Sequence, residues 1–436
     1  RQDSNVLREG RYFENNSLYG KIDIPLPSDT KLSLTTGYSE PRINTGDLPS
    51  SDLATGLSTH VYFATASLAS ALTDDLSLEV SIYTLKRKSV INTNILGTGD
   101  WDPNEEAGEL FEQDVFKEKN EGGSGKLVWM SDMQTAVVGA EYSRGRLDNS
   151  IRTGEIMQTL YGSPEKVETE PGISKWAVFF NDTISINNFS VTPGIRYDKN
   201  NGSGDFISPS LGATYKVDSR TVIRASVARG FTSPSLPWMS GGALWLDPNP
   251  DLKPEKVWSY HAGIESTIQD YFRAGATVFY HEMKNEMVYE LNPDTGNDIF
   301  INRGKIKRNG TEITVETVPF YNVSGKAGFA YVRRTDIEEE TYNEKYSYNL
   351  SARYDDKRSF SAQLDGRYFW WDYDFTGTKY NTFIWDLNLN KKIQIKEKIK
   401  PEIFLVAHNI FNATRYSMED RKNPRRWIEA GIRVSF

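Results

Sequence analysis

The last ten residues of the chain, Trp427 to Phe436, read Trp-Ile-Glu-Ala-Gly-Ile-Arg-Val-Ser-Phe and alternate in polarity to the final position. Successive side chains of a strand point to opposite sides, so Ile428, Ile432, Val434 and Phe436 share an apolar face and the other face is mostly polar. A soluble sandwich would turn the apolar face to a core. A membrane barrel would turn it to lipid and the polar face to a wet lumen. Both interpretations fit this strand alone, and the rest of the chain decides between them.

The composition excludes membrane-spanning helices. Of the 436 residues, 38% are hydrophobic and 25% are charged, and the mean hydropathy is −0.56. No apolar run approaches the length of about 20 residues that a helical span requires. The 10 Trp, 23 Tyr and 21 Phe are a bias typical of barrels whose aromatic girdles mark two membrane interfaces.

Short turns and longer polar stretches alternate along the chain. A hairpin is predicted from Leu18 to Tyr38, and the same arrangement of two strands around a short turn recurs to the end of the sequence. The predicted turns lie at 26–29, 73–75, 131–134, 187–188, 218–219, 269–270, 319–320, 355–358 and 391–397. This rhythm is typical of an up-and-down antiparallel barrel with tight turns at one rim and large loops at the other.

Many of the predicted strands repeat the polarity pattern of the last one. In residues 346–354 Tyr, Leu and Ala alternate with Ser, Asn and Arg, and residues 272–280 behave in the same way. A soluble fold of this size would need a second apolar layer, but the sequence offers no amphipathic helix and no wholly apolar strand to supply it. We therefore predict an all-β transmembrane barrel over residues 1–436, with about nineteen to twenty strands countable in the sequence.

Motifs of catalysis and nucleic-acid binding are missing from the sequence. There is no HExxH or GxSxG motif, and the segment 120–127 lacks both the first Gly and the Ser or Thr of a phosphate loop. A sequence without Cys excludes a disulfide framework and thiolate metal sites. The net charge of −8 gives no reason to expect nucleic acid as a partner. We predict no enzyme activity and no cofactor.

One acidic stretch partly matches a calcium-binding loop. Asp100, Asp102 and Asn104 have the spacing of the first ligands, but Glu105 stands where the turn glycine belongs and Phe111 where the closing Glu belongs. We expect a solvated acidic loop here, with calcium binding as the alternative.

Two groups of motifs resemble the TonB-dependent outer-membrane receptors. The first comprises 228–236 (Ala-Arg-Gly-Phe-Thr-Ser-Pro-Ser-Leu), 249–256 (Asn-Pro-Asp-Leu-Lys-Pro-Glu-Lys), Tyr260 and 263–265 (Gly-Ile-Glu). The second comprises 406–412 (Val-Ala-His-Asn-Ile-Phe-Asn), Tyr416 and 431–436 (Gly-Ile-Arg-Val-Ser-Phe), which are similar to the closing strands and assembly signal of that family. His408 and Asn412 depart from the family pattern. The specific motifs lie in the second half of the chain.

The resemblance implies a 22-stranded barrel filled by an N-terminal plug domain. Neither a plug nor its TonB-binding motif is found in this sequence, and Leu18 to Tyr38 reads as an early hairpin, not as the opening strand. We therefore expect the plug, and possibly the first strands, to precede Arg1.

The function implied by the resemblance is active transport across the outer membrane of a Gram-negative bacterium. The receptor would bind a ferric siderophore, cobalamin or similar metal chelate at its extracellular loops and import it with energy from TonB, ExbB and ExbD. Outer-membrane lipid, lipopolysaccharide and the barrel assembly machinery are the other expected partners. Two alternatives remain open: a passive porin without a plug, and a barrel that sheathes a partner protein.

Candidate site residues fall in one long connection and on the lumen side of several strands. Apolar side chains at a loop apex are costly unless something covers them, so we expect ligand contacts from Trp238, Met239, Trp245 and Leu246. The polar faces of the strands are expected to turn Arg196, Arg224, Arg353, His261 and Glu265 toward the lumen, where arginines would attract an anionic chelate or balance nearby carboxylates.

Overall fold

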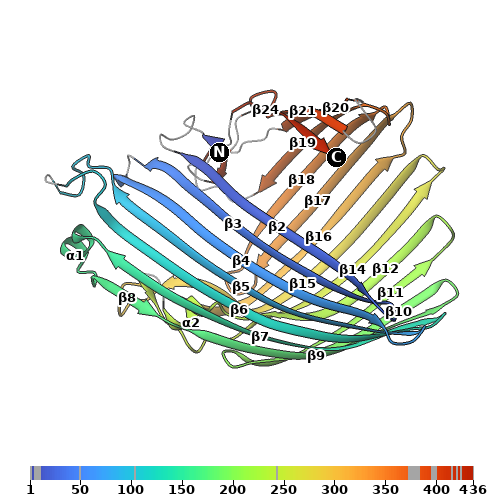
Figure 1. Ribbon diagram of the computed structural model, residues 1–436, viewed down its shortest axis with the longest axis horizontal. Helices are drawn as coiled ribbons and strands as arrows, with labels where there is room; N and C mark the ends of the chain where they lie inside the picture. Colours follow the sequence, from blue (N-terminus) through green and yellow to red (C-terminus); the bar gives the residue numbers. More distant parts are fainter. Residues whose placement is uncertain are drawn as a thin grey trace.

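The computed structural model describes residues 2–3, 11–48, 51–102, 105–241, 244–371, 383–393, 400–413, 416–418, 421–422 and 425–435. Within these residues one sheet contains 22 strands, and a separate two-stranded sheet pairs β22 (Tyr416–Met418) with β23 (Arg421–Lys422). Figure 1 shows the strands of the main sheet running diagonally, tilted as barrel strands are.

Nineteen strands of nine or more residues follow one another along the chain. They are β2 (Tyr12–Leu26), β3 (Thr30–Leu48), β4 (Leu53–Ala71), β5 (Leu76–Ile95), β6 (Leu110–Met130), β7 (Gln134–Thr153), β9 (Gly172–Ile186), β10 (Phe189–Asn200), β11 (Gly204–Lys216), β12 (Thr221–Thr232), β14 (Glu255–Ile268), β15 (Phe272–Leu291), β16 (Asp298–Thr317), β17 (Val323–Asp336), β18 (Thr341–Asp355), β19 (Phe360–Trp371), β20 (Ile384–Lys392), β21 (Lys400–His408) and β24 (Trp427–Ser435). Shorter elements are β1 (Gln2–Asp3), β8 (Lys166–Thr169), β13 (Leu246–Asp247), α1 (Glu155–Tyr161) and α2 (Leu236–Ser240).

Each long strand pairs antiparallel with the next long strand in the sequence. The pairing runs without interruption from β2–β3 to β21–β24, which confirms the predicted up-and-down topology and the predicted number of strands. Among the described residues no pairing joins β24 to β1 or β2.

The tight turns lie where Pro, Asn, Asp and Ser predicted them. Ser28 and Asp29 adopt positive φ between β2 and β3, and Asn187 does so between β9 and β10. Asn and Asp tolerate this left-handed conformation better than other non-glycine residues. The last predicted turn, 391–397, lies partly outside the described residues. The predicted tight turns fall at one rim, which we call the turn rim. The opposite rim, the loop rim, carries the longer connections together with short ones at 201–203 and 337–340.

The two faces of the sheet differ in polarity. Apolar side chains such as Ile82, Val138 and Ile432 are exposed on the outer face, as a lipid-facing wall requires. The inner face carries hydroxyl pairs between neighbouring strands, including Ser67 with Ser81 at 3.0 Å. The predicted faces are therefore confirmed. No helix in the described part of the chain is long and apolar enough to cross a membrane.

An aromatic girdle marks the outer face toward the loop rim. Neighbouring strands pair Tyr38 with Tyr62, whose ring centroids are 4.9 Å apart, and Trp176 with Tyr197 at 5.3 Å. Beyond this girdle the polarity of β5 to β7 is reversed, because the strands continue into water: charged side chains face outward, and inward-facing Ile151 is buried. The buried apolar side chains of the molecule gather mainly near the loop rim, among them Ile95, Leu147, Ile151, Ile156, Met157 and Leu252.

Candidate functional site

The connection between β12 and β14, residues 233–254, is described except at 242–243 and is anchored to β16. Its strand β13 pairs in parallel with Asp298 and Ile299 at the start of β16. The Asp247 carboxylate accepts hydrogen bonds from Asn292 at 2.7 Å and Asn297 at 2.9 Å, and from the Thr295 hydroxyl. The Thr295 and Asn297 hydrogen bonds hold the pKa of Asp247 below its usual value, so this anchor stays ionised.

The motif Asn-Pro-Asp-Leu-Lys-Pro at 249–254 attaches the end of this loop to a neighbouring strand. The Asn249 side-chain amide donates to the Phe300 carbonyl at 2.8 Å. The Asn302 side chain accepts from the Lys253 backbone N–H at 2.7 Å and donates to the Lys253 carbonyl at 2.8 Å. The motif therefore clamps the end of the loop to β16.

The predicted ligand residues of this loop have different neighbours. Trp238 stacks nearly flat on Phe300, with ring centroids 4.0 Å apart and an interplanar angle of 14°. Met239 and Leu246 are half-buried. Trp245 is 46% exposed, although its carbonyl is tied to the Asp298 backbone N–H at 2.7 Å. Its φ of 63° is a left-handed conformation that few non-glycine residues adopt.

Trp245 belongs to a row of aromatic rings contributed by three separate connections. Its ring meets Tyr161 at the end of α1 edge-on, with centroids 6.1 Å apart. Tyr161 lies 6.2 Å from Trp101, and Trp101 lies 5.2 Å from Phe111 at the start of β6. The sequence analysis missed Tyr161 and Trp101 as partners of Trp245. A tryptophan inside an acidic, glycine-rich stretch was the signal that could have drawn attention to Trp101.

The acidic loop 96–109 is organised around the Glu105 carboxylate. This group accepts backbone hydrogen bonds from Gly99, Trp101 and Asp102. Asp52, which is fully buried, accepts another from Thr98 at 3.1 Å. Of the calcium candidates, Asn104 lies outside the described residues. No three acidic or histidine side chains come together as a metal site in the part that the structure describes.

Two carboxyl groups lie close together on the inner face of β6 at the loop rim. Burial, together with the neighbouring Asp114, raises the pKa of Glu112 to about 7. Burial also raises the pKa of Asp114. The pair therefore carries less negative charge near neutral pH than its sequence suggests.

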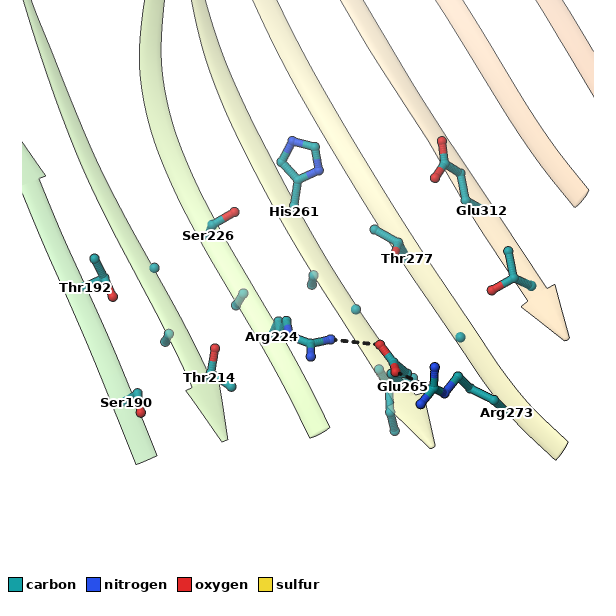
Figure 2. A pocket seen from close by; sticks show the side chains of 18 residues that line it. Ser190, Thr192, Thr214, Arg224, Ser226, His261, Glu265, Arg273, Thr277 and Glu312 are labelled. Atoms are coloured by element: carbon teal, nitrogen blue, oxygen red, sulfur yellow. Dashed lines mark hydrogen bonds and ion pairs between the residues drawn. The ribbon is translucent and has the colours of Figure 1, made fainter. Parts of the chain in front are cut away.

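A second candidate region is a hollow of about 640 Å³ on the inner wall near the turn rim. Figure 2 shows Arg224 of β12 and Arg273 of β15 on either side of Glu265 of β14. The Arg224 Nη1 to Glu265 Oε2 distance is 3.2 Å, and the Arg273 Nε to Glu265 Oε1 distance is 3.7 Å. His261 also lines this hollow, together with Thr192. Glu312 lines the same hollow, so its two guanidinium groups are matched in formal charge by two carboxylates.

The other two predicted arginines lie elsewhere on the wall. Arg196 pairs with Glu141 at 2.7 Å and with Asp198 at 2.9 Å. Arg353 pairs with Asp355 at 2.8 Å. Both are balanced by carboxylates, which is one of the two roles expected of them. Arg273 was not predicted, because only the register between β14 and β15 brings it to Glu265.

The predicted assembly signal lies on the outer face of the closing strand. Ile428, Ile432 and Val434 are all exposed there. Phe436 lies outside the described residues.

Comparisons with known proteins agree with this architecture. A family model described as "TonB dependent receptor-like, beta-barrel" matches residues 1–413. The chain is 27% identical over 242 residues to the ferric enterobactin receptor of Pseudomonas aeruginosa, covering 50% of this chain and 32% of that protein. It is 25% identical over 171 residues to the vitamin B12 transporter of Vibrio vulnificus, covering 37% of this chain and 26% of that protein. The matched segments thus span about a third or less of these curated relatives.

Solved structures share the fold over nearly the whole chain. The copper transporter OprC superposes with a TM-score of 0.75 at 12% identity, covering 97% of this chain and 72% of that one. A mutant of the ferric enterobactin receptor of Pseudomonas aeruginosa gives a TM-score of 0.73 at 17% identity, covering 98% and 70%. At these identities the likeness concerns the fold alone. With its strand order, its faces and its match over residues 1–413, the chain belongs to the TonB-dependent receptor-like β-barrel family.

Proposed function

We propose that this chain is the barrel of an outer-membrane receptor that captures a scarce ligand at the loop rim and imports it with energy from TonB. The ligand class is a ferric siderophore, cobalamin or a similar metal chelate. Membership of the family supports this proposal, and so do relatives named as a ferric enterobactin receptor and a vitamin B12 transporter. A plug domain encoded before Arg1 would close the lumen.

The row of aromatic rings at the loop rim is the observation that carries the proposal. An exposed tryptophan on a well-anchored loop is costly in water unless a partner covers it. The anchors of β13 and Asp247 also fix the loop before any ligand arrives, which lowers the entropy lost on binding. Behind this rim the lumen wall is polar, as a path for a hydrated chelate would require.

The ligand site is proposed to include Trp245, Leu246 and Met239, with Trp238 as a supporting residue. Aromatic and apolar groups around a few polar ones are the usual lining of small-molecule sites. The arginines around Glu265 lie deeper on the lumen wall, where their guanidinium groups would donate hydrogen bonds to an anionic chelate after it leaves the rim.

The proposal also assigns an orientation and partners. The turn rim is periplasmic and the loop rim extracellular, in the outer membrane of a Gram-negative bacterium. TonB, ExbB and ExbD supply energy from the inner membrane. The barrel assembly machinery recognises the closing strand β24, and lipopolysaccharide surrounds the extracellular half of the wall.

Growth of a deletion strain on single iron chelates and corrinoids tests the proposal. The strain is expected to lose growth on one compound, and the intact gene is expected to restore it only in cells with functional TonB. Restoration without TonB would instead support a passive porin. A polypeptide that co-purifies inside the lumen would support a sheath, and unimpaired growth on every compound would refute the transport proposal.

A further inference from the structure

The rings of the aromatic row at the loop rim meet at steep angles and do not form a stack. Tyr161 makes an interplanar angle of 71° with Trp245 and of 64° with Trp101, and the ring centroids are 6.1 and 6.2 Å apart. Stacked rings cover each other's faces, whereas rings at steep angles leave faces open beside their point of contact. Tyr161 is 48% exposed and Trp245 is 46% exposed. The row therefore presents open ring faces at the loop rim.

Contacts that leave these faces free hold the rings in place. The Trp101 Nε1–H donates to the Ser51 carbonyl at 3.2 Å, and the Trp101 backbone N–H donates to the Glu105 carboxylate at 3.1 Å. Tyr161 is the last residue of α1, a helix that is seated by its buried residues Ile156 and Met157. The backbone of Trp245 is tied to the start of β16, as described above. The ring faces are thus oriented before a ligand arrives, which lowers the entropy lost on binding.

The angles between the rings indicate the shape of the group that fits them. A planar aromatic group would need two parallel rings to lie between, and this row has none at Tyr161. The face of an aromatic ring is negative, so several ring faces that surround one point attract a compact cation. Ammonium groups are bound in this way by cages of aromatic rings.

The connections that contribute the rings are acidic. Residues 96–109 contain five acidic residues and residues 154–165 contain two, and neither segment has a Lys, Arg or His. The connection 233–254 adds two Asp and one Lys. The carboxylates of Asp100, Glu106 and Glu155 are exposed. Carboxylates gathered on one rim raise the local concentration of cations and repel anions.

The carboxyl pair that follows Phe111 on β6 agrees with this field. The pKa of Glu112 is raised to about 7 by burial and by Asp114, and burial raises the pKa of Asp114. A lysine or arginine close to the pair would lower these pKa values, and none of the described residues does so. The positive charge that this part of the rim lacks can therefore come from a ligand.

We propose that the aromatic row is the seat of an ammonium group, so that the ligand of this receptor carries a protonated or quaternary amine. Tyr161, Trp245 and Trp101 supply the ring faces, and the exposed carboxylates attract the charge. The inference rests on the proposed function, which supplies the chelate. The amine is a separate group from the anionic metal-binding oxygens that would meet the lumen arginines. An iron chelate with a pendant amine fits this site better than cobalamin, whose side chains end in uncharged amides.

The test measures how the purified receptor binds choline and its uncharged isostere, in which a tert-butyl group replaces the trimethylammonium group. We expect the parent to bind choline about tenfold more tightly than the isostere. Tyr161→Leu should weaken choline binding by about fivefold, because it removes a ring face but keeps an apolar side chain. Tyr161→Phe keeps the ring and is the matched control, with binding like that of the parent. Unfolding temperatures of both variants show whether the loop remains folded.

A second pair of variants tests the carboxylates. The double variant Asp100→Asn, Glu106→Gln should weaken choline binding by about twofold or more at low salt, and by less at high salt, because salt screens exposed charges. Binding of the isostere should not change. Asp132→Asn removes an exposed carboxylate at the turn rim and should leave choline binding as it is in the parent.

Three results would overturn the proposal. They are choline binding no tighter than binding of the isostere, an equal loss in Tyr161→Leu and Tyr161→Phe, and a growth-rescuing compound without an amine in the deletion strain. The choline measurement does not depend on transport. A receptor that prefers choline while the deletion strain grows on every compound would contradict the proposed function and leave the ammonium seat in place. Import of a chelate by a receptor that shows no preference for choline would contradict the ammonium seat alone.

Discussion

Trp238 and Trp245 lie in the same connection, but their environments give them different roles. Trp238 uses its ring to hold the loop on Phe300. Trp245 is held by its backbone, so its ring is left half-exposed against Tyr161. A ring whose position is fixed by the main chain is suited to binding, since its contacts are not needed to maintain the fold.

Replacement of each tryptophan by alanine should separate these roles. Trp245→Ala is expected to weaken ligand binding by about 2 kcal/mol, or roughly 30-fold, because it removes an aromatic anchor, and to leave the unfolding temperature unchanged. Trp238→Ala should lower the unfolding temperature, since the ring stack alone contributes about 1 kcal/mol. Binding titrations and thermal unfolding of both variants check this. Normal binding by Trp245→Ala, or a loss that only follows reduced stability, would show that the loop is structural.

Single residues were predictable where the signal was local. The prolines and tryptophans of the 233–254 connection are visible in the sequence, and so is the lumen side of Arg224 and Glu265. Tyr161, Trp101 and Arg273 were not, because other strands and loops bring them to their partners. Their role depends on register and on loop packing, which no stretch of sequence encodes alone.

At the scale of elements, the strands were predictable because each carries its own period-two pattern and each tight turn its own Asn, Asp, Pro or Ser. The short elements α1, α2, β8 and β13 were not predicted. They form where loops pack on neighbouring strands, as β8 does on β7 and β13 on β16. The reversal of polarity beyond the girdle was not predicted either. The alternation of side chains continues there, and only the surroundings of the outer face change from lipid to water.

The closing strand β24 offers a direct test of its faces. Ile432→Arg should cost about 2 to 4 kcal/mol near the bilayer midplane, because it puts a charge into lipid. Arg433→Ser should cost far less, since Arg433 lies on the lumen side with Glu402 3.2 Å away and the Phe404 ring 4.5 Å away. The yield of folded, heat-modifiable barrel from membranes measures the difference. Equal yields would mean that the faces are reversed.

At the scale of the whole molecule, the two rims are unlike each other. Nearly every turn-rim connection is a short turn, whereas the loop rim carries α1, α2, β8, β13 and most of the buried apolar side chains. The loop rim of the described residues is thus a small folded layer on top of a membrane wall.

Cysteine labelling on intact cells tests the orientation of these rims. The chain has no Cys, so single substitutions are the only labelled sites in this sequence. Asp251→Cys and Asp294→Cys at the loop rim should react with an impermeant maleimide. Arg358→Cys at the turn rim should react only after the outer membrane is opened. Labelling of Arg358→Cys on intact cells would invert the proposed topology.

The reversal of polarity on β5 to β7 also determines how deep the barrel sits. On the turn-rim side of the girdle, the apolar outer face is stable only in hydrocarbon. On the loop-rim side, where Lys86, Lys119 and Arg146 lie, the outer face is stable only in water or among lipid headgroups. If the barrel moved into the membrane by the length of two residues, these three cations would approach the acyl chains. If it moved out by the same distance, Ile82 and its apolar neighbours would lose their contact with lipid. The outer wall of the barrel therefore sets the depth of the barrel in the membrane, and with it the height of the loop rim above the membrane surface.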